Sequence, residues 1–224
     1  MAEDRSSSIE KHYRNLSLPT DANLHAGVIV DIGTGDGHYV YTAARQNPDK
    51  FYIGIDANTS GLEKISEKIY RKPTKGGTPN ALFVNASVED LPCELDGVAD
   101  EVHIHFPWGS LLQAIAAGNQ NVLRAIRRIC AGGALLEIVI GSDPDRDRSE
   151  LARLAVPALT REYLSNTLVP AYAAAGFEVM EQGVLQPSEW PALQTTWSKR
   201  LRGGRDRTLV YIIAQAVKSH VVTG

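Results

Sequence analysis

A glycine-rich turn follows the first apolar strand predicted in this 224-residue chain. Val28-Ile29-Val30 precedes Asp31-Ile32-Gly33-Thr34-Gly35-Asp36-Gly37, and a segment of helical composition comes next. Only glycine adopts such a tight turn without strain and leaves room for a ligand against main-chain N–H groups at a helix start. The spacing therefore predicts a strand, a ligand-binding turn and a helix, the first unit of a parallel α/β sheet.

The charges around this turn indicate which ligand it holds. The dinucleotide fingerprint G-x-G-x-x-G places a pyrophosphate at the turn, but here the third glycine comes one residue early, and Asp31 and Asp36 add two carboxylates. Such charge repels phosphates and suits an ammonium and a sulfonium, the charged groups of S-adenosylmethionine (SAM). A second strand, 51–55, ends in Asp56, about 20 residues beyond the turn, where an acid accepts hydrogen bonds from ribose hydroxyls. The alternative is an ordinary glycine turn and a strand-ending acid.

The composition is that of a globular enzyme, with 43% hydrophobic and 22% charged residues, and we expect one domain over 1–224. No apolar run is long enough to span a membrane, and the polar start lacks the apolar core of a signal peptide, so a cytoplasmic protein is expected. Cys93 and Cys130 stand far apart without metal-ligand neighbours, which favours free thiols. A formal net charge of -3 argues weakly against a nucleic-acid partner, but the average hides where the charges lie.

Strands and helices alternate along the chain, which is typical of a doubly wound, mostly parallel sheet covered on both faces. The later elements that we expect are helix 62–70, strand 81–84, strand 102–106, helix 120–129, a turn at Gly132-Gly133, strand 134–140, and a terminal antiparallel hairpin of 179–185 and 209–216 at the sheet edge. Ligands of such sheets bind at the carboxyl ends of the strands, where Asp31, Asp56 and Glu89 all fall. Glu89 is placed to accept a hydrogen bond from an adenine amino group.

Two further features concern the substrate. Phe106-Pro107-Trp108-Gly109-Ser110 follows the fourth strand, where a methyltransferase of this fold presents its substrate. An exposed tryptophan there would stack on a nucleobase, worth roughly 1–3 kcal/mol, although a core tryptophan explains this segment equally well. Cationic clusters at 68–75 and 197–207, the second beginning with a tryptophan, favour a localised phosphate-binding surface in an otherwise acidic chain.

Four segments together resemble the aminoglycoside-resistance 16S rRNA methyltransferases of the kanamycin–apramycin type, which modify N1 of adenine 1408 in the decoding site. They are the turn 31–37, Lys72-Pro73-Thr74-Lys75-Gly76-Gly77, the segment 106–110 and the segment 197–207. The resemblance implies a Rossmann-like class I SAM-dependent methyltransferase that acts on 16S rRNA within the assembled 30S subunit, and we expect a monomer. The likeness is poor over 1–27, interpreted as a divergent N-terminal extension. It is loose over 141–167, interpreted as a long connecting segment that contacts the substrate.

The resemblance also assigns roles to single residues. With the acids derived above, the SAM site is predicted to comprise Asp31, Gly33, Thr34, Gly35, Asp56, Val88, Glu89, His105, Phe106, Pro107, Ser110 and Thr195. Trp108 and Trp197 are implied to hold the flipped adenine between them. The residues implied to dock on rRNA phosphates are Lys68, Arg71, Lys72, Lys75, Arg200, Arg205 and Arg207, with Arg146, Arg148 and Arg153 as further candidates.

The implied reaction needs no strong base, because adenine N1 carries a lone pair; His103 and His105 are interpreted as packing or backbone contacts. Two alternatives remain open. One is another SAM-dependent RNA methyltransferase, such as a tRNA guanine-N7 enzyme, against which the 72–77 segment and Trp197 weigh. The other is a non-catalytic SAM-binding or rRNA-binding module, which the intact acids and Trp108 disfavour.

Overall fold

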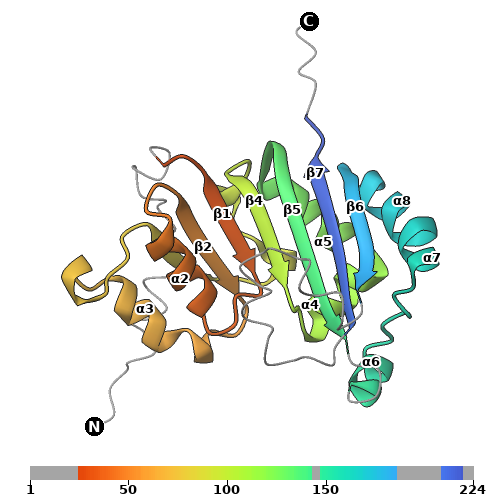
Figure 1. Cartoon of the computed structure of the whole chain (residues 1–224), viewed down its shortest axis with the longest axis horizontal. Coiled ribbons are helices and arrows are strands. Elements are labelled where there is room, and N and C mark those ends of the chain that lie inside the picture. Colours follow the sequence, from red (N-terminus) through yellow and green to blue (C-terminus); the bar gives the residue numbers. More distant parts are fainter. Residues whose placement is uncertain (1–24, 143–146, 186–207, 219–224) are drawn as a thin grey trace, which may run out of the picture.

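The computed structural model describes residues 25–142, 147–185 and 208–218. Seven strands form one sheet in the order β3-β2-β1-β4-β5-β7-β6, as Figure 1 shows. Their bounds are β1 Val28–Ile32, β2 Phe51–Asp56, β3 Ala81–Asn85, β4 Ala99–His105, β5 Cys130–Ser142, β6 Phe177–Leu185 and β7 Thr208–Ala216. β1 to β5 are parallel, and β7 runs antiparallel to β5 and β6. The prediction of a doubly wound, mostly parallel sheet with a terminal hairpin is confirmed.

Helices cover both faces of this sheet (Figure 1). Their bounds are α2 His38–Gln46, α3 Glu63–Ile69, α4 Gly109–Ala117, α5 Gln120–Ile129, α6 Arg148–Arg153, α7 Arg161–Tyr163 and α8 Val169–Ala174. The shorter turns are the 3-10 helices η2 Thr59–Gly61, η3 Pro73–Lys75, η4 Val88–Asp90 and η5 Cys93–Leu95, and the π-helix η6 Leu164–Leu168. Within the described ranges, no helix combines the length and apolar character that crossing a bilayer requires.

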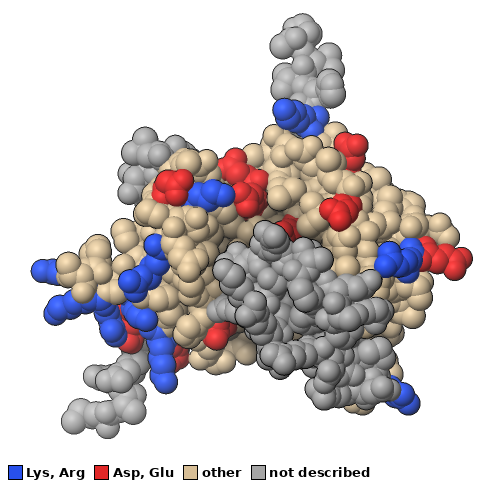
Figure 2. Space-filling view, in the orientation of Figure 1, with Lys and Arg blue, Asp and Glu red and all other residues tan. Residues whose placement is uncertain are grey.

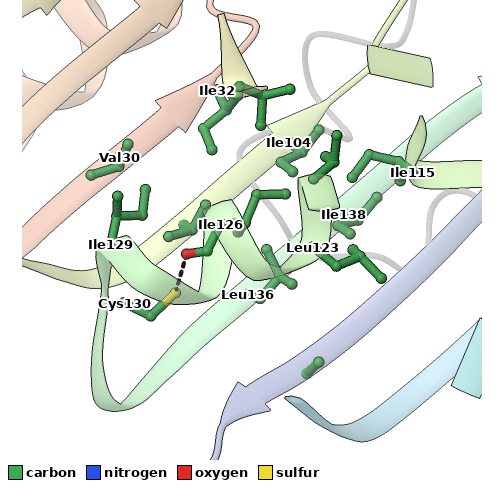
Figure 3. Packing of buried hydrophobic residues seen from close by; sticks show 14 of the residues in the cluster. Val30, Ile32, Ile104, Ile115, Leu123, Ile126, Ile129, Cys130, Leu136 and Ile138 are labelled. Carbon is green, nitrogen blue, oxygen red and sulfur yellow. Dashed lines mark hydrogen bonds between the residues drawn. The ribbon is translucent and has the colours of Figure 1, made fainter. Parts of the chain in front are cut away.

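The alternation of side chains along β1 shows how the sheet separates two cores. Val28, Val30 and Ile32 point to one face, where they join the side chains of α4, α5 and α8 in the larger core. Ile29 points to the other face and packs with α2 and α3. Figure 3 shows part of the larger core, in which Leu123 and Ile126 of α5 lie over the strands. Because both faces are buried, the central strands are apolar runs.

Polar and glycine residues set the junction between α4 and α5. Gly118 ends α4 in the left-handed conformation, with φ of 66°. Asn119 then begins α5, since its side-chain oxygen accepts hydrogen bonds from the N–H groups of Asn121 and Val122. These two caps satisfy backbone groups that a helix end leaves without intrahelical partners.

One expectation about β5 needs correction. The strand begins at Cys130, and the predicted turn at Gly132-Gly133 is an irregularity inside it, where the pairing with β4 shifts register. Gly133 has φ of 91°, a conformation open to glycine, so the strand continues past the irregularity.

The described part of 141–167, the predicted connecting segment, includes helical turns. It contains α6, α7 and most of η6. Leu154 is buried in the larger core, and Leu151, Val156 and Leu159 pack against that core. These apolar contacts pack the segment against the larger core. The apolar residues are interspersed with charged ones, so their spacing was not recognised in the sequence.

Candidate functional site

The glycine turn between β1 and α2 has the conformation that its sequence requires. Gly33, Gly35 and Gly37 have φ of 77°, 60° and 69°, which other residues adopt only with strain. A Cβ atom at Gly37 would lie 2.7 Å from the ring of Phe83 on β3, which explains why position 37 is a glycine. The N–H of Gly33 donates to the carbonyl of Ile55 at 2.8 Å and ties the turn to the end of β2.

Asp56, the last residue of β2, also holds this turn. Its Oδ2 accepts a hydrogen bond from the N–H of Gly35 at 2.8 Å, and its Oδ1 accepts one from the N–H of Asn58 at 2.8 Å. A carboxylate offers about four acceptor positions. Asp56 therefore keeps capacity for hydroxyl donors while it fixes the turn.

A cavity of about 530 Å³ lies at the carboxyl ends of β1, β2 and β4. The predicted residues that line it are Gly33, Gly35, Asp56, Val88, Glu89, Phe106, Pro107, Trp108, Gly109 and Ser110, the last five from the predicted segment 106–110. The lining residues that the sequence did not predict are Ile32, Ile55, Ala57, Asn58, Ala86, Ser87 and Leu111. Most of these are neighbours of predicted residues, so the strand-end rule pointed to the segments but not to every side chain.

The charge of the cavity fits SAM. Asp56 and Glu89 are the two residues with charged side chains among those that line it in the described part of the chain. Ile32, Ile55 and Val88 supply apolar wall of the kind that binds a purine ring. An acidic, partly apolar cavity favours a nucleoside that carries positive charge and disfavours one that carries a pyrophosphate.

Three predicted SAM-site residues do not line this cavity. Asp31, Thr34 and His105 are all less than a tenth exposed. His105 Nε2 lies 2.8 Å from Oε1 of Glu137 on β5, and burial lowers its pKa although that hydrogen bond opposes the shift. Asp31 follows the alternation of β1 and shares the face of Ile29, which directs it under α2.

His103 takes part in a buried side-chain network instead of a simple packing or backbone contact. The hydroxyl of Tyr39 lies 2.8 Å from His103 Nδ1, and His103 Nε2 lies 3.4 Å from Oε2 of Glu101. The hydrogen bond from His103, followed by that from Lys50, lowers the pKa of Glu101 to about 2 despite its partial burial. None of these side chains is among the described residues that line the cavity.

Trp108 lies at the cavity and is about half exposed (52%), so it does not close the core. It follows Phe106, whose φ of 51° is rare for a bulky residue. Two contacts hold Phe106 in place. Its N–H donates to the carbonyl of Val139 at 2.7 Å. Its ring packs closely over Gly141, where an added Cβ atom would lie only 2.8 Å from the ring. The strand end is therefore fixed while Trp108 remains available for stacking.

The first predicted cationic cluster forms an exposed surface. Lys68 lies on α3, and Arg71, Lys72 and Lys75 follow it around η3. Figure 2 shows Lys and Arg side chains gathered at the left of the view, where Figure 1 places α3. The second cationic cluster, with Trp197, Arg200, Arg205 and Arg207, lies outside the described residues. The same holds for Thr195, Arg146 and most of 1–27.

The fold and the acidic nucleoside cavity define a Rossmann-like SAM-dependent methyltransferase. A comparison with protein families then gives the particular group. The chain belongs to the NpmA family, described as 16S rRNA (adenine(1408)-N(1))-methyltransferase, whose model matches residues 12–216. The family named by the resemblance is confirmed.

Similar proteins agree with this assignment. A 16S rRNA (adenine(1408)-N(1))-methyltransferase of Streptoalloteichus tenebrarius is 39% identical over 181 residues, 80% of this chain and 82% of the relative. The crystal structure of the aminoglycoside resistance methyltransferase NpmB1 is 47% identical, with a TM-score of 0.75 over 86% of this chain and 88% of that one. A mutant of the 16S rRNA (adenine(1408)-N(1))-methyltransferase from Catenulisporales acidiphilia, solved with cosubstrate SAM, is 32% identical, with a TM-score of 0.76 over 88% of each chain.

Proposed function

We propose that this protein transfers the methyl group of SAM to N1 of adenine 1408 in 16S rRNA and so confers resistance to aminoglycosides. The observation that carries the proposal is Trp108, half exposed at the rim of an acidic nucleoside cavity in a chain of the NpmA family. We further propose that the substrate is the assembled 30S subunit and that the enzyme acts as a cytoplasmic monomer with one catalytic domain.

The residues of the cavity hold and orient the cosubstrate. SAM supplies a methyl group bonded to a positively charged sulfur, which makes that carbon open to attack. Asp56 accepts hydrogen bonds from the ribose hydroxyls, and Glu89 accepts one from the adenine amino group. The carboxylates also favour the positive charge of the ligand over the neutral product, which has lost the sulfonium.

Trp108 positions the target base. An adenine inside an RNA structure must leave its stack, at a cost of a few kcal/mol, before N1 can reach the methyl group. Stacking on a tryptophan is worth roughly 1–3 kcal/mol and offsets part of that cost. In this proposal Trp197 stacks on the opposite side of the base, and Thr195 completes the cavity. The remaining barrier falls because the base is held in line for transfer.

The cationic surface supplies docking. Lys68, Arg71, Lys72 and Lys75 contact rRNA phosphates, together with Arg200, Arg205 and Arg207. Arg148 and Arg153 lie on α6, and the exposed Arg153 is paired with Glu150 at 2.6 Å, which neutralises part of its charge toward a phosphate.

The substrate proposal predicts methylation of 30S subunits and little or none of protein-free 16S rRNA, because two distant cationic segments match a folded surface better than a flexible strand. Purified enzyme and SAM should be incubated with each substrate and the rRNA read by primer extension. A methyl group on the Watson–Crick edge stops the polymerase, so a stop at adenine 1408 is expected with 30S subunits. Equal methylation of both substrates would reject the 30S requirement, and no stop on either would reject the function.

The role of Asp56 predicts that Asp56→Ala weakens binding of SAM about 10- to 150-fold, since hydrogen bonds to a charged group are worth roughly 1.5–3 kcal/mol. Isothermal titration calorimetry measures this loss. Asp49→Ala is the matched control, because this exposed acid lies before the opposite end of β2. An unchanged dissociation constant in Asp56→Ala would remove Asp56 from the site.

A further inference from the structure

Two cationic side chains from different helices converge on Tyr41. The Nη1 of Arg45 on α2 donates to the Tyr41 hydroxyl at 2.7 Å, and the Arg45 guanidinium carbon lies 5.5 Å from the ring centre. The Nζ of Lys68 on α3 lies 4.2 Å from the same ring centre. Tyr41 itself is buried, so it forms a fixed base beneath both cations.

The Tyr41 hydroxyl also fixes the turn that carries the neighbouring cations. It donates to the carbonyl of Gly76 at 3.0 Å. A Cβ at Gly76 would lie 3.5 Å from Cε of Lys68 and 3.8 Å from Nη1 of Arg45, so both cations border the glycine. One tyrosine thus brings α2, α3 and the 72–77 turn together.

No carboxylate in the described residues lies within ion-pair distance of Arg45 or Lys68. Cations held this close repel each other, and contact with an aromatic ring offsets only part of that repulsion. Arg45 also borders a hollow of about 420 Å³, shared with Pro73 and Gly77. Lys68 does not line this hollow, but it meets Arg45 beside Gly76, next to Gly77 of the lining. Two cations prearranged in this way are suited to an anion.

We propose that Arg45, oriented by Tyr41, forms a phosphate-binding site with Lys68 that receives a backbone phosphate of the rRNA. This inference rests on the proposed function and adds to it a residue outside the predicted docking clusters. Arg45 contacts the phosphate, and Tyr41 is a positioning residue that acts through it. The site is continuous with the cations of the 72–77 turn and extends the docking surface onto α2.

Salt dependence of 30S binding tests the inference. Each phosphate contact releases about one counterion, and affinity falls as salt rises. Loss of one contact therefore makes the negative slope of log affinity against log salt shallower by about 1. Arg45→Gln removes the charge and keeps an N–H donor for Tyr41. We expect it to weaken binding roughly tenfold at 0.1 M KCl and to lower the slope by about 1, with unchanged SAM affinity and melting temperature.

Two further variants separate charge from position. Arg124→Gln is the matched control, an exposed arginine on α5 at the opposite face of the sheet. It should leave affinity and slope unchanged. Tyr41→Phe keeps both cations and the ring but removes the hydroxyl, so binding should weaken with the wild-type slope. Arg45→Lys, which restores the charge, should recover most of the slope.

The outcomes distinguish this site from the proposed function. If Arg45→Gln binds 30S subunits with the same affinity and slope as Arg124→Gln while wild-type enzyme methylates them, Arg45 contacts no phosphate. If wild-type enzyme binds SAM but neither binds nor methylates 30S subunits, the proposed function is wrong and this inference falls with it. A lower melting temperature in Arg45→Gln, with a wild-type slope, would make Arg45 structural.

Discussion

Replacing Trp108 by alanine is expected to reduce methyl transfer to 30S subunits about 100-fold or more. The loss has two sources: stacking worth roughly 1–3 kcal/mol disappears, and the target base is no longer held in line, where a misplacement of about 1 Å costs about 100-fold. Trp108 is half exposed, so its removal opens no cavity in the core. The single-turnover rate at saturating SAM measures the effect.

Control measurements decide whether Trp108 acts on the substrate. Binding of SAM should change far less than the transfer rate, and 30S binding should persist because the cationic surface is intact. Trp108→Phe keeps an aromatic face and should retain much of the activity. A Trp108→Ala protein that methylates 30S subunits near the wild-type rate would disprove stacking on the base. The same assay on Trp197→Ala tests the second proposed stacking residue.

The largest expected effect on stability is at Ile126. This side chain of α5 is fully buried, and Figure 3 shows it over the central strands, among Leu123, Ile104 and Leu136. Ile126→Ala removes three carbon atoms and leaves a cavity, which costs about 2–5 kcal/mol. That is a large share of the roughly 5–15 kcal/mol typical of a folded protein. Urea unfolding followed by circular dichroism measures the loss.

Graded variants check that packing is responsible. Ile126→Val removes one carbon atom and should cost about 0.5–1.5 kcal/mol. Arg124→Ala, two residues earlier on the exposed side of α5, should change stability by less than about 0.5 kcal/mol. A loss below about 1 kcal/mol in Ile126→Ala would show that the core relaxes around the gap.

The sequence predicted segments of the site better than it predicted individual side chains. The glycine turn, Asp56 and Glu89 were found because strand ends and glycine spacing are local signals. Asp31 was assigned to the site because its carboxylate suits a positively charged ligand; in the structure it does not line the cavity, and strand alternation places it on the face of Ile29. That periodicity was present in the sequence, but the assignment was made from charge alone.

Features that depend on packing between elements were not predictable from local pattern. Arg45 is one of several cations along the chain, and its contact with Tyr41 beside Lys68 arises only when α2 and α3 pack on the same face. The start of β5 at Cys130 was missed for a similar reason. A pair of glycines usually marks a turn, whereas pairing with β4 keeps this stretch extended.

The hydrogen bond between Asp56 and Gly35 has a consequence for how this enzyme can change. One carboxylate both closes the glycine turn and, in our proposal, holds the ribose of SAM, so the turn is organised before the ligand arrives. Such preorganisation lowers the entropic cost of association. It also means that cosubstrate binding and the shape of the glycine turn cannot evolve independently, because any substitution of Asp56 changes both. Natural variants of this enzyme are therefore expected to differ mainly in the docking surface, while Asp56 and the glycine turn stay unchanged.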